Sequence, residues 1–170
     1  MTGVDAAAEN IAAACSHAEL VQNPEDVYTL VRTLRVPSRR VHLLGNGIDL
    51  ERFTPTAVPI DVRRRVRAEW GIGFNEVVVG VVARLVREKG IVEILEAAHR
   101  VHEAGLPARF VIVGPTDPDK HDAIDPALVA RAAEDRVVFT GRRDDMPECY
   151  SAMDLFLTAS WREGFPRSAM

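Results

Sequence analysis

The hydrophobic positions along the chain follow two spacings, and their alternation predicts the order of the elements. Continuous apolar runs such as EVVVGVVARLV are typical of strands buried on both faces of a sheet. Between these runs, apolar residues recur every three or four positions, as in GIVEILEAAHRVHEAG, which predicts amphipathic helices. The predicted strands are residues 76–86, 109–115, 136–141 and 154–160, and the predicted helices are residues 59–71, 90–105, 126–133 and 145–153.

Strands that alternate with helices in this way predict an α/β fold with a parallel sheet and right-handed crossovers. Four strands are fewer than a doubly wound sheet usually contains, so we expect an incomplete sheet of that kind. Residues 1–37 precede this pattern, and we expect them to form a small segment ahead of the main sheet. In it, AELVQ predicts a strand, and NPEDVYTLVRTL predicts a helix that Asn23 and Pro24 begin. The length of 170 residues favours one compact unit, to which residues 1–37 would be a small preface.

Composition and charge limit the classes of function. Apolar residues make up 47% of the 170 positions and charged residues 27%, which is typical of a globular protein with a core. The net charge of −4 argues against a general binder of nucleic acid or of anionic membranes. Cys15 and Cys149 lie far apart, and the alanine-rich start lacks the features of a signal peptide. These features predict a cytoplasmic protein.

Charged and small residues gather in the loops that follow the predicted strands, where open parallel sheets bind their ligands. Arg84 ends the first long strand, and Lys89 begins the next helix. Two cations beside a helix N-terminus suit a diphosphate. An alternative interpretation makes both residues solvated loop charges that pair with Glu88. Likewise, Glu163 and Gly164 after the last strand are either part of a site or an ordinary turn.

Two other kinds of site are disfavoured. The dinucleotide pattern G-x-G-x-x-G is absent after the first long strand, which counts against an NAD enzyme. Asp117, Asp119 and Asp122 resemble a calcium loop only loosely, because Pro118 interrupts them and no glycine or final glutamate follows in register. No histidine has a partner at the spacing of metal ligands, so we expect no metal site.

The segments GNGIDLERF, GVVARLVREKG, FVIVG and VVFTGRRDDMPECYSAMDLFLTASWREGFPRSAM together resemble the C-terminal half of glycosyltransferase family 4. Members of this family are retaining transferases with nucleotide-sugar donors and two Rossmann-like domains, the GT-B fold. The resemblance covers nearly all of residues 20–170. It implies that residues 1–37 are a remnant of the N-terminal domain with the crossing segment. Residues 38–170 would form an incomplete nucleotide-sugar-binding domain with a partial Rossmann-like parallel sheet.

The resemblance also implies roles for individual residues. Arg84 and Lys89 would hold the donor diphosphate and stabilise charge on the leaving nucleotide. Glu163 matches the first acid of the family's E-x7-E motif and would accept hydrogen bonds from the donor sugar. These three residues would form the catalytic set. The remaining donor-binding residues implied are Gly114 beneath the nucleotide, Gly141, Arg142 and Arg143 beside the nucleobase, and Ser160, Gly164 and Phe165 near the sugar.

The reaction implied is transfer of a hexose-type sugar to an acceptor hydroxyl with retention, as in polysaccharide biosynthesis. The nucleotide sugar is the substrate, with UDP favoured over GDP, and neither a cofactor nor a metal is implied. A sugar or lipid-linked acceptor would bind the N-terminal domain, and the full-length protein could contact the inner membrane face. The second acid of the motif would follow Met170, so we expect a truncated chain that is inactive alone. The alternatives are a non-catalytic nucleotide-binding remnant and a sugar-nucleotide epimerase.

Overall fold

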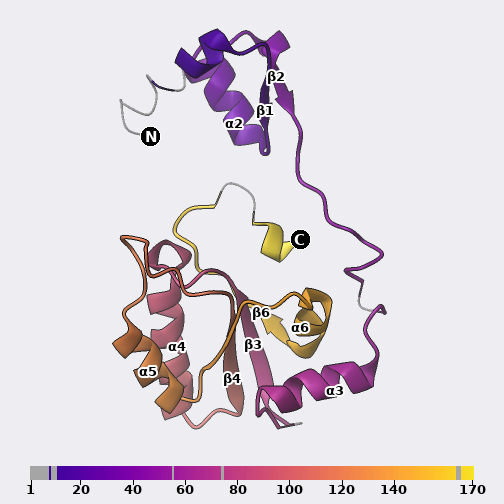
Figure 1. Ribbon diagram of the computed structural model, residues 1–170, viewed down its shortest axis with the longest axis vertical. Helices are drawn as coiled ribbons and strands as arrows, with labels where there is room; N and C mark the ends of the chain where they lie inside the picture. The colour runs from indigo at the N-terminus through magenta and orange to yellow at the C-terminus, as the bar shows by residue number, and fades with distance from the viewer. Residues whose placement is uncertain (1–7, 9–10, 55, 74, 164–165) are drawn as a thin grey trace. The chain divides into compact units, whose positions relative to one another are not determined.

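A computed structural model of the chain describes residues 8, 11–54, 56–73, 75–163 and 166–170. Its backbone contacts divide the chain into two compact units (Figure 1). The first is formed by Met1–Ile48 with Gly164–Arg167, and the second by Asp49–Glu163 with Ser168–Met170. The division after residue 37 was expected from the family resemblance, which assigns residues 1–37 to an N-terminal domain. That assignment stays a prediction.

The first unit contains a two-stranded parallel sheet and a short helical segment. Asn23 precedes the helix and accepts a hydrogen bond from the Asp26 amide at 2.8 Å, which satisfies one of the donors at the helix start. A small apolar core of Ala13, Leu30, Leu34 and Val36 packs between the elements. From residue 19 onward its elements are β1 (Glu19–Val21), α2 (Pro24–Tyr28), a π-helical turn (Thr29–Thr33), a 3-10 turn (Ser38–Arg40) and β2 (Val41–Leu43), and residues 11–15 are also helical.

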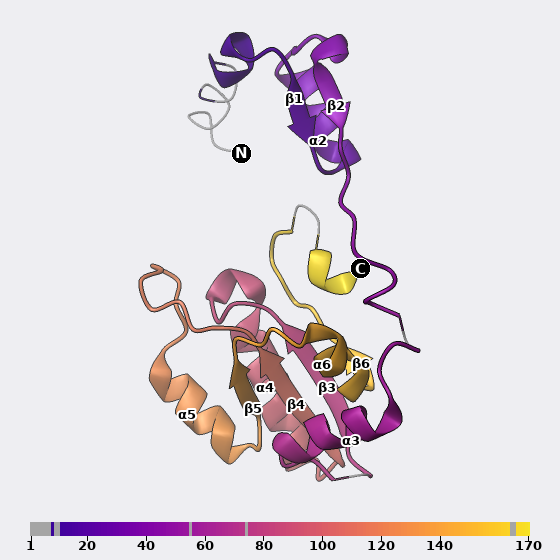
Figure 2. The same cartoon turned by 45° about the vertical axis from the view of Figure 1, so that its right-hand side comes forward.

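The second unit is a four-stranded parallel sheet with helices on both faces (Figures 1 and 2). The strand order is β5-β4-β3-β6, and this confirms the predicted α/β fold. Among the described residues, no helix combines the length and apolar character needed to cross a membrane. The strands are β3 (Val77–Val82), β4 (Ala108–Val113), β5 (Val138–Gly141) and β6 (Leu155–Phe156). The helices are α3 (Ile60–Glu69), α4 (Ile91–Glu103), α5 (Pro126–Glu134) and α6 (Met146–Ala152).

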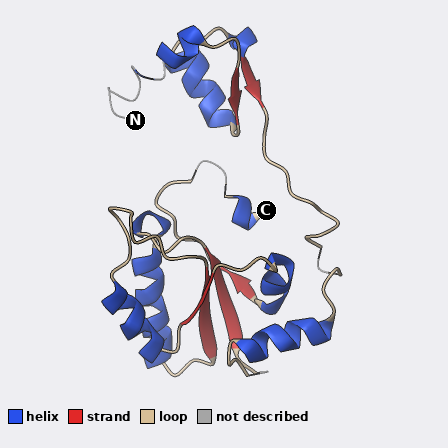
Figure 3. Ribbon diagram, viewed as in Figure 1, coloured by secondary structure: helices blue, strands red, loops and turns tan. Residues whose placement is uncertain are grey.

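Helices lie on both sides of the strands (Figure 3), and the two central strands are largely buried, which explains their continuous apolar sequences. Successive strand residues point to opposite faces. Val81 of β3 accordingly packs with Ile94 of α4 in one core cluster, whereas Val78 packs with Val66 of α3 in the other. The first cluster lies under α4 and α5, and the second lies under α3 and α6. The sheet is therefore the middle layer of three.

The last predicted strand is shorter than expected: of residues 154–160, only Leu155–Phe156 form β6. The amide of Asp154 donates to the Val78 carbonyl at 2.9 Å, and the amide of Leu157 donates to Gly80. Beyond Leu157 the chain leaves the sheet, although β3 continues to Val82, and the amide of Trp161 donates to the carbonyl of Glu88 in the turn before α4. The expectation of a seven-residue strand was wrong because the segment after β6 turns toward the start of α4 instead of following β3, and hydropathy does not report which segments pair.

Candidate functional site at the carboxyl edge of the sheet

The connection between β3 and α4 brings the candidate residues to one place. After β3 the chain makes a 3-10 turn (Arg87–Lys89), and α4 begins at Ile91. Gly90 joins the two with a φ of 68°, a left-handed conformation that favours glycine. A Cβ atom at Gly90 would lie 2.1 Å from the Ala159 carbonyl oxygen. Glycine at this position therefore lets the segment after β6 lie against the start of α4.

Lys89 and Glu163 form an ion pair across this contact. Lys89 Nζ lies 2.7 Å from Glu163 Oε1, and the hydroxyl of Ser160 donates to the same oxygen at 2.8 Å. The hydrogen bond from Lys89 lowers the pKa of Glu163 below its ordinary value, with burial opposing it and Ser160 adding to it. Glu163 is therefore a carboxylate at neutral pH. The structure brings together Lys89, Ser160 and Glu163, three residues that the sequence singled out.

Arg84 lies on the other side of the same turn. One terminal nitrogen, Nη1, lies 2.9 Å from Asp117 Oδ2, and Nη2 lies 3.4 Å from Glu88 Oε1. The pairing with Glu88 considered from the sequence is thus present, but it is the longer of the two contacts. Glu88 directly precedes Lys89, so the two ion pairs, Arg84 with Glu88 and Lys89 with Glu163, meet in this one turn.

The ends of β3, β4 and β5 also meet at this edge. A Cβ atom at Gly114 would lie 1.9 Å from the Ala83 carbonyl oxygen, so only a glycine fits there without movement of the backbone. The amide of Gly114 donates to the carbonyl of Gly141 at 2.9 Å. Gly114 and Gly141 therefore lie beside the strand end that leads to Arg84. Their predicted contacts with a nucleotide stay predictions.

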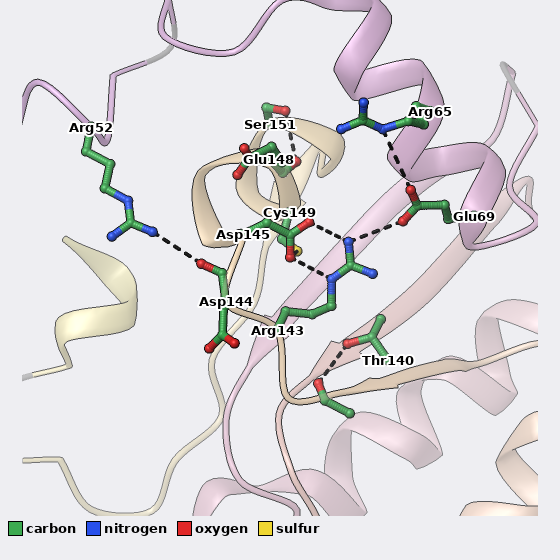
Figure 4. Close-up of polar contacts among 11 residues, drawn as sticks. Arg52, Arg65, Glu69, Thr140, Arg143, Asp144, Asp145, Glu148, Cys149 and Ser151 are labelled. Atoms are coloured by element: carbon green, nitrogen blue, oxygen red, sulfur yellow. Dashed lines mark hydrogen bonds and ion pairs between the residues drawn. The ribbon is translucent and has the colours of Figure 1, made fainter.

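Arg143, whose place beside the nucleobase stays a prediction, contacts acidic side chains of the second unit (Figure 4). Its guanidinium binds both carboxylate oxygens of Asp145, at 2.7 and 2.5 Å, and reaches Glu69 at 3.2 Å. The hydrogen bonds from Arg143 lower the pKa of Asp145, and burial raises the pKa of the neighbouring Cys149 thiol to about 11. Arg143 thus connects α3 with the loop before α6. Arg142 is exposed and lies 3.6 Å from Asp144.

Sequence reasoning missed two residues of this edge, Asp117 and Asp122. Both were considered only as parts of a calcium loop, yet Asp117 pairs with Arg84, and the Asp122 carboxylate accepts from the Glu88 amide at 3.2 Å. Within the part of the chain that the structure describes, no three acidic, histidine or cysteine side chains are placed to hold a metal ion. Their position in the sequence could have identified them, because both residues follow β4, whose carboxyl end lies at the same edge of the sheet as Arg84. Gly164 and Phe165 lie outside the described residues.

The arrangement can bind an anion and a hydroxyl group side by side. Arg84 before the 3-10 turn and Lys89 at its end lie near the start of α4, where the first helical amides have no partner within the helix. Such an end of a 13-residue helix favours negative charge. The carboxylate of Glu163 is an acceptor-only group. A ligand with a phosphate group near sugar hydroxyls would match these donors and acceptors.

Comparison with known proteins identifies the family to which the chain belongs. Residues 76–170, more than half of the chain, match the family described as "Glycosyl transferases group 1". A GDP-mannose-dependent alpha-mannosyltransferase of Mycobacterium tuberculosis is 34% identical over 74% of this chain and 29% of its own length. The UDP-Gal:alpha-D-GlcNAc-diphosphoundecaprenol alpha-1,3-galactosyltransferase of Escherichia coli is 29% identical over 93% of this chain and 40% of its own length.

Solved structures agree on the fold. The crystal structure of Anabaena Alr3699/HepE in complex with UDP-glucose superposes on 99% of this chain with a TM-score of 0.81 and 20% sequence identity. The chain covers 45% of that protein, and it matches the C-terminal Rossmann-like half of GT-B glycosyltransferases. It therefore spans less than half the length of these relatives. On its sequence and its fold, the chain belongs to the group 1 glycosyl transferases.

Proposed function

We propose that the chain is the donor-binding half of a retaining glycosyltransferase of the hexosyltransferase type. The observation that carries the proposal is the 2.7 Å ion pair between Lys89 and Glu163, whose positions are 74 residues apart in the sequence. It supports one site in which a cation for the diphosphate and an acceptor for the sugar are neighbours. Arg84, Lys89 and Glu163 would contact the donor and act as the catalytic set.

Arg84 and Lys89 would hold the diphosphate of the nucleotide sugar. When the glycosidic bond to the nucleotide breaks, negative charge grows on the departing diphosphate. Fixed cations and helix amides at that point stabilise this charge in the transition state. The ion pairs with Asp117 and Glu163 keep both cationic side chains near the turn before a donor arrives. This chemistry would need no cofactor.

Glu163 would orient the donor sugar. Both hydrogen bonds that it accepts from described residues fall on Oε1. The lone pairs of Oε2 would then accept from sugar hydroxyls, because an ionised carboxylate accepts at both oxygens. Gly114 and Gly141 would border the nucleotide at the ends of β4 and β5.

The donor class follows from the family and from the named relatives. One relative is named for UDP-galactose and another for GDP-mannose, and a related structure contains UDP-glucose. We favour a UDP-hexose as donor and a saccharide or lipid-linked saccharide as acceptor. A lipid-linked acceptor would bring the reaction to the cytoplasmic face of a membrane.

Calorimetric titration with UDP and with GDP tests the proposal. We expect the 170-residue chain to bind UDP, and the Arg84→Ala/Lys89→Ala double variant to bind it at least about 100-fold more weakly, since each charge-assisted hydrogen bond contributes about 1.5–3 kcal/mol. Arg87→Ala is the matched control, because Arg87 is an exposed cation of the same 3-10 turn. Its affinity should stay within about threefold of wild type, as expected for an exposed charge. Equal affinities of wild type and double variant would refute the proposal.

A further inference from the structure

Arg84 has a second partner whose position is set by the backbone. Asp117 Oδ2 lies 2.9 Å from Arg84 Nη1, and only 28% of the Asp117 side chain is exposed. Glu88, the other partner, is 53% exposed and lies 3.4 Å away, which is near the limit for a hydrogen bond. The contact with Asp117 is therefore the one that can hold the guanidinium in place.

The loop that carries Asp117 is bound to the segment that carries Arg84. The amide of Leu85 donates to the Pro115 carbonyl at 3.1 Å, and a parallel bridge pairs Leu85 with Thr116, which directly precedes Asp117. On the other side of the loop, the amide of Ile124 donates to the Leu85 carbonyl at 3.2 Å. Leu85, the residue after Arg84, therefore pairs through its backbone with both the beginning and the end of this loop.

Burial and a second acid strengthen this connection. Leu85 is 3% exposed, and Val86 is 1% exposed and forms an antiparallel bridge with Ala123. Asp122 accepts from the Arg87 amide through its carbonyl at 2.8 Å and from the Glu88 amide through its carboxylate. Because the loop is held at both ends against a buried segment, the Asp117 carboxylate has a defined position relative to Arg84.

We propose that Asp117 is a positioning residue for Arg84: it holds the guanidinium in one orientation, so that its remaining N–H groups face the diphosphate of the donor. This inference rests on the proposed function, and it adds a residue that neither the sequence pattern nor the comparisons assign. Arg84 is 42% exposed on a long, flexible side chain. Ordering such a side chain costs binding free energy, and a partner in the free protein removes part of that cost.

The charge of Asp117 also has an effect on UDP affinity opposite to that of positioning Arg84. The negative charge of Asp117 repels a diphosphate, so a carboxylate that only neutralised Arg84 would weaken binding. Two substitutions separate the effects. Asp117→Asn removes the charge and keeps an oxygen that can accept from Arg84 Nη1, whereas Asp117→Ala removes both. Asp119→Ala is the matched control, since Asp119 is an exposed acid in the same loop.

The test combines UDP titration with NMR of the Arg84 side chain, whose Nε–Hε signal is assigned by its loss in Arg84→Lys. In Asp117→Ala we expect the signal to show fast motion and the Kd for UDP to rise about 3- to 10-fold, which corresponds to the ordering of one long side chain. In Asp117→Asn the signal should stay ordered, with a Kd within about twofold of wild type or lower. Asp119→Ala should match wild type in both measurements.

The other outcomes identify which idea fails. An Arg84 signal that stays ordered in Asp117→Ala overturns the inference. It does not bear on the proposed function, which the UDP titration of the Arg84→Ala/Lys89→Ala variant tests separately. Tighter UDP binding by both Asp117 variants also overturns it, because Asp117 would then be a competitor. If wild type binds neither UDP nor GDP although Arg84 is ordered by Asp117, the proposed function fails and the role toward a diphosphate fails with it.

Discussion

Arg67 and Asp154 form an ion pair that joins α3 to the start of β6, with 2.5 Å between Nη2 and Oδ2. Arg67 is 7% exposed, and its Nε also donates to the Ala152 carbonyl. Asp154 accepts from the Val78 amide at 2.7 Å and from Arg63 at 2.6 Å. Burial alone would raise the pKa of Asp154, but these hydrogen bonds lower it. One carboxylate therefore connects α3, β3 and β6.

Removal of this carboxylate should destabilise the second unit. We expect Asp154→Asn to lower the free energy of unfolding by about 2–4 kcal/mol, because it leaves the buried Arg67 without its charged partner. Urea unfolding followed by circular dichroism measures the loss. Asp144→Asn is the control, since the Asp144 side chain is 90% exposed, and it should change stability by less than about 0.5 kcal/mol. Similar values for the two variants would contradict the structural role of Asp154.

The Lys89–Glu163 pair should make stability depend on pH in the acid range. The folded pKa of Glu163 lies below its ordinary value of 4.5, so the pair stabilises the fold above pH 4.5 and this contribution is lost as the pH falls further. We expect wild type to exceed Lys89→Met by about 1 kcal/mol at pH 7, and the difference to shrink below pH 4.5. Urea unfolding at several pH values measures it, with Arg87→Met as the control. A difference that stays constant with pH would exclude this pair as its source.

Gly90 should tolerate alanine less well than another glycine of the same conformation. Gly90 and Gly105 have φ values of 68° and 67°, but a Cβ atom at Gly105 would meet nothing within 4 Å. Gly105→Ala therefore measures backbone strain alone, about 1–2 kcal/mol. Gly90→Ala adds the clash with Ala159 and should cost at least about 1 kcal/mol more. Its UDP affinity should also fall, because the segment that carries Glu163 must move. Equal costs would mean that the two segments do not touch.

Arg143 should act on stability more than on nucleotide binding. Arg143→Lys keeps the charge but loses the two-pronged contact with Asp145, so we expect a loss of about 1–3 kcal/mol in unfolding free energy. UDP affinity should change much less than in Arg84→Ala. The exposed neighbour Arg142 provides the control, and Arg142→Lys should leave stability unchanged. A large loss of UDP affinity at full stability would instead support the expected role of Arg143 beside the nucleobase.

The sequence by itself determined the order of the elements and the parallel sheet. The valine-rich runs around Val78 and Val111 identify strands buried on both faces, since a helix with one exposed side would need polar residues at its own period. Once the strands are parallel, their carboxyl ends share an edge, so the loops of Arg84 and Gly114 could be assigned to that edge without coordinates.

Only the tertiary structure decided which partners these loop residues have. Lys89 with Glu163, Arg84 with Asp117 and Arg143 with Asp145 and Glu69 are pairs of charges, and a charge in a loop has many possible partners within reach. The extent of β6 likewise depended on where its chain stops pairing with β3 and turns toward the start of α4. Hydropathy reports whether a side chain is buried, whereas pairing depends on distances between segments far apart in the sequence, and those distances exist only in the folded chain.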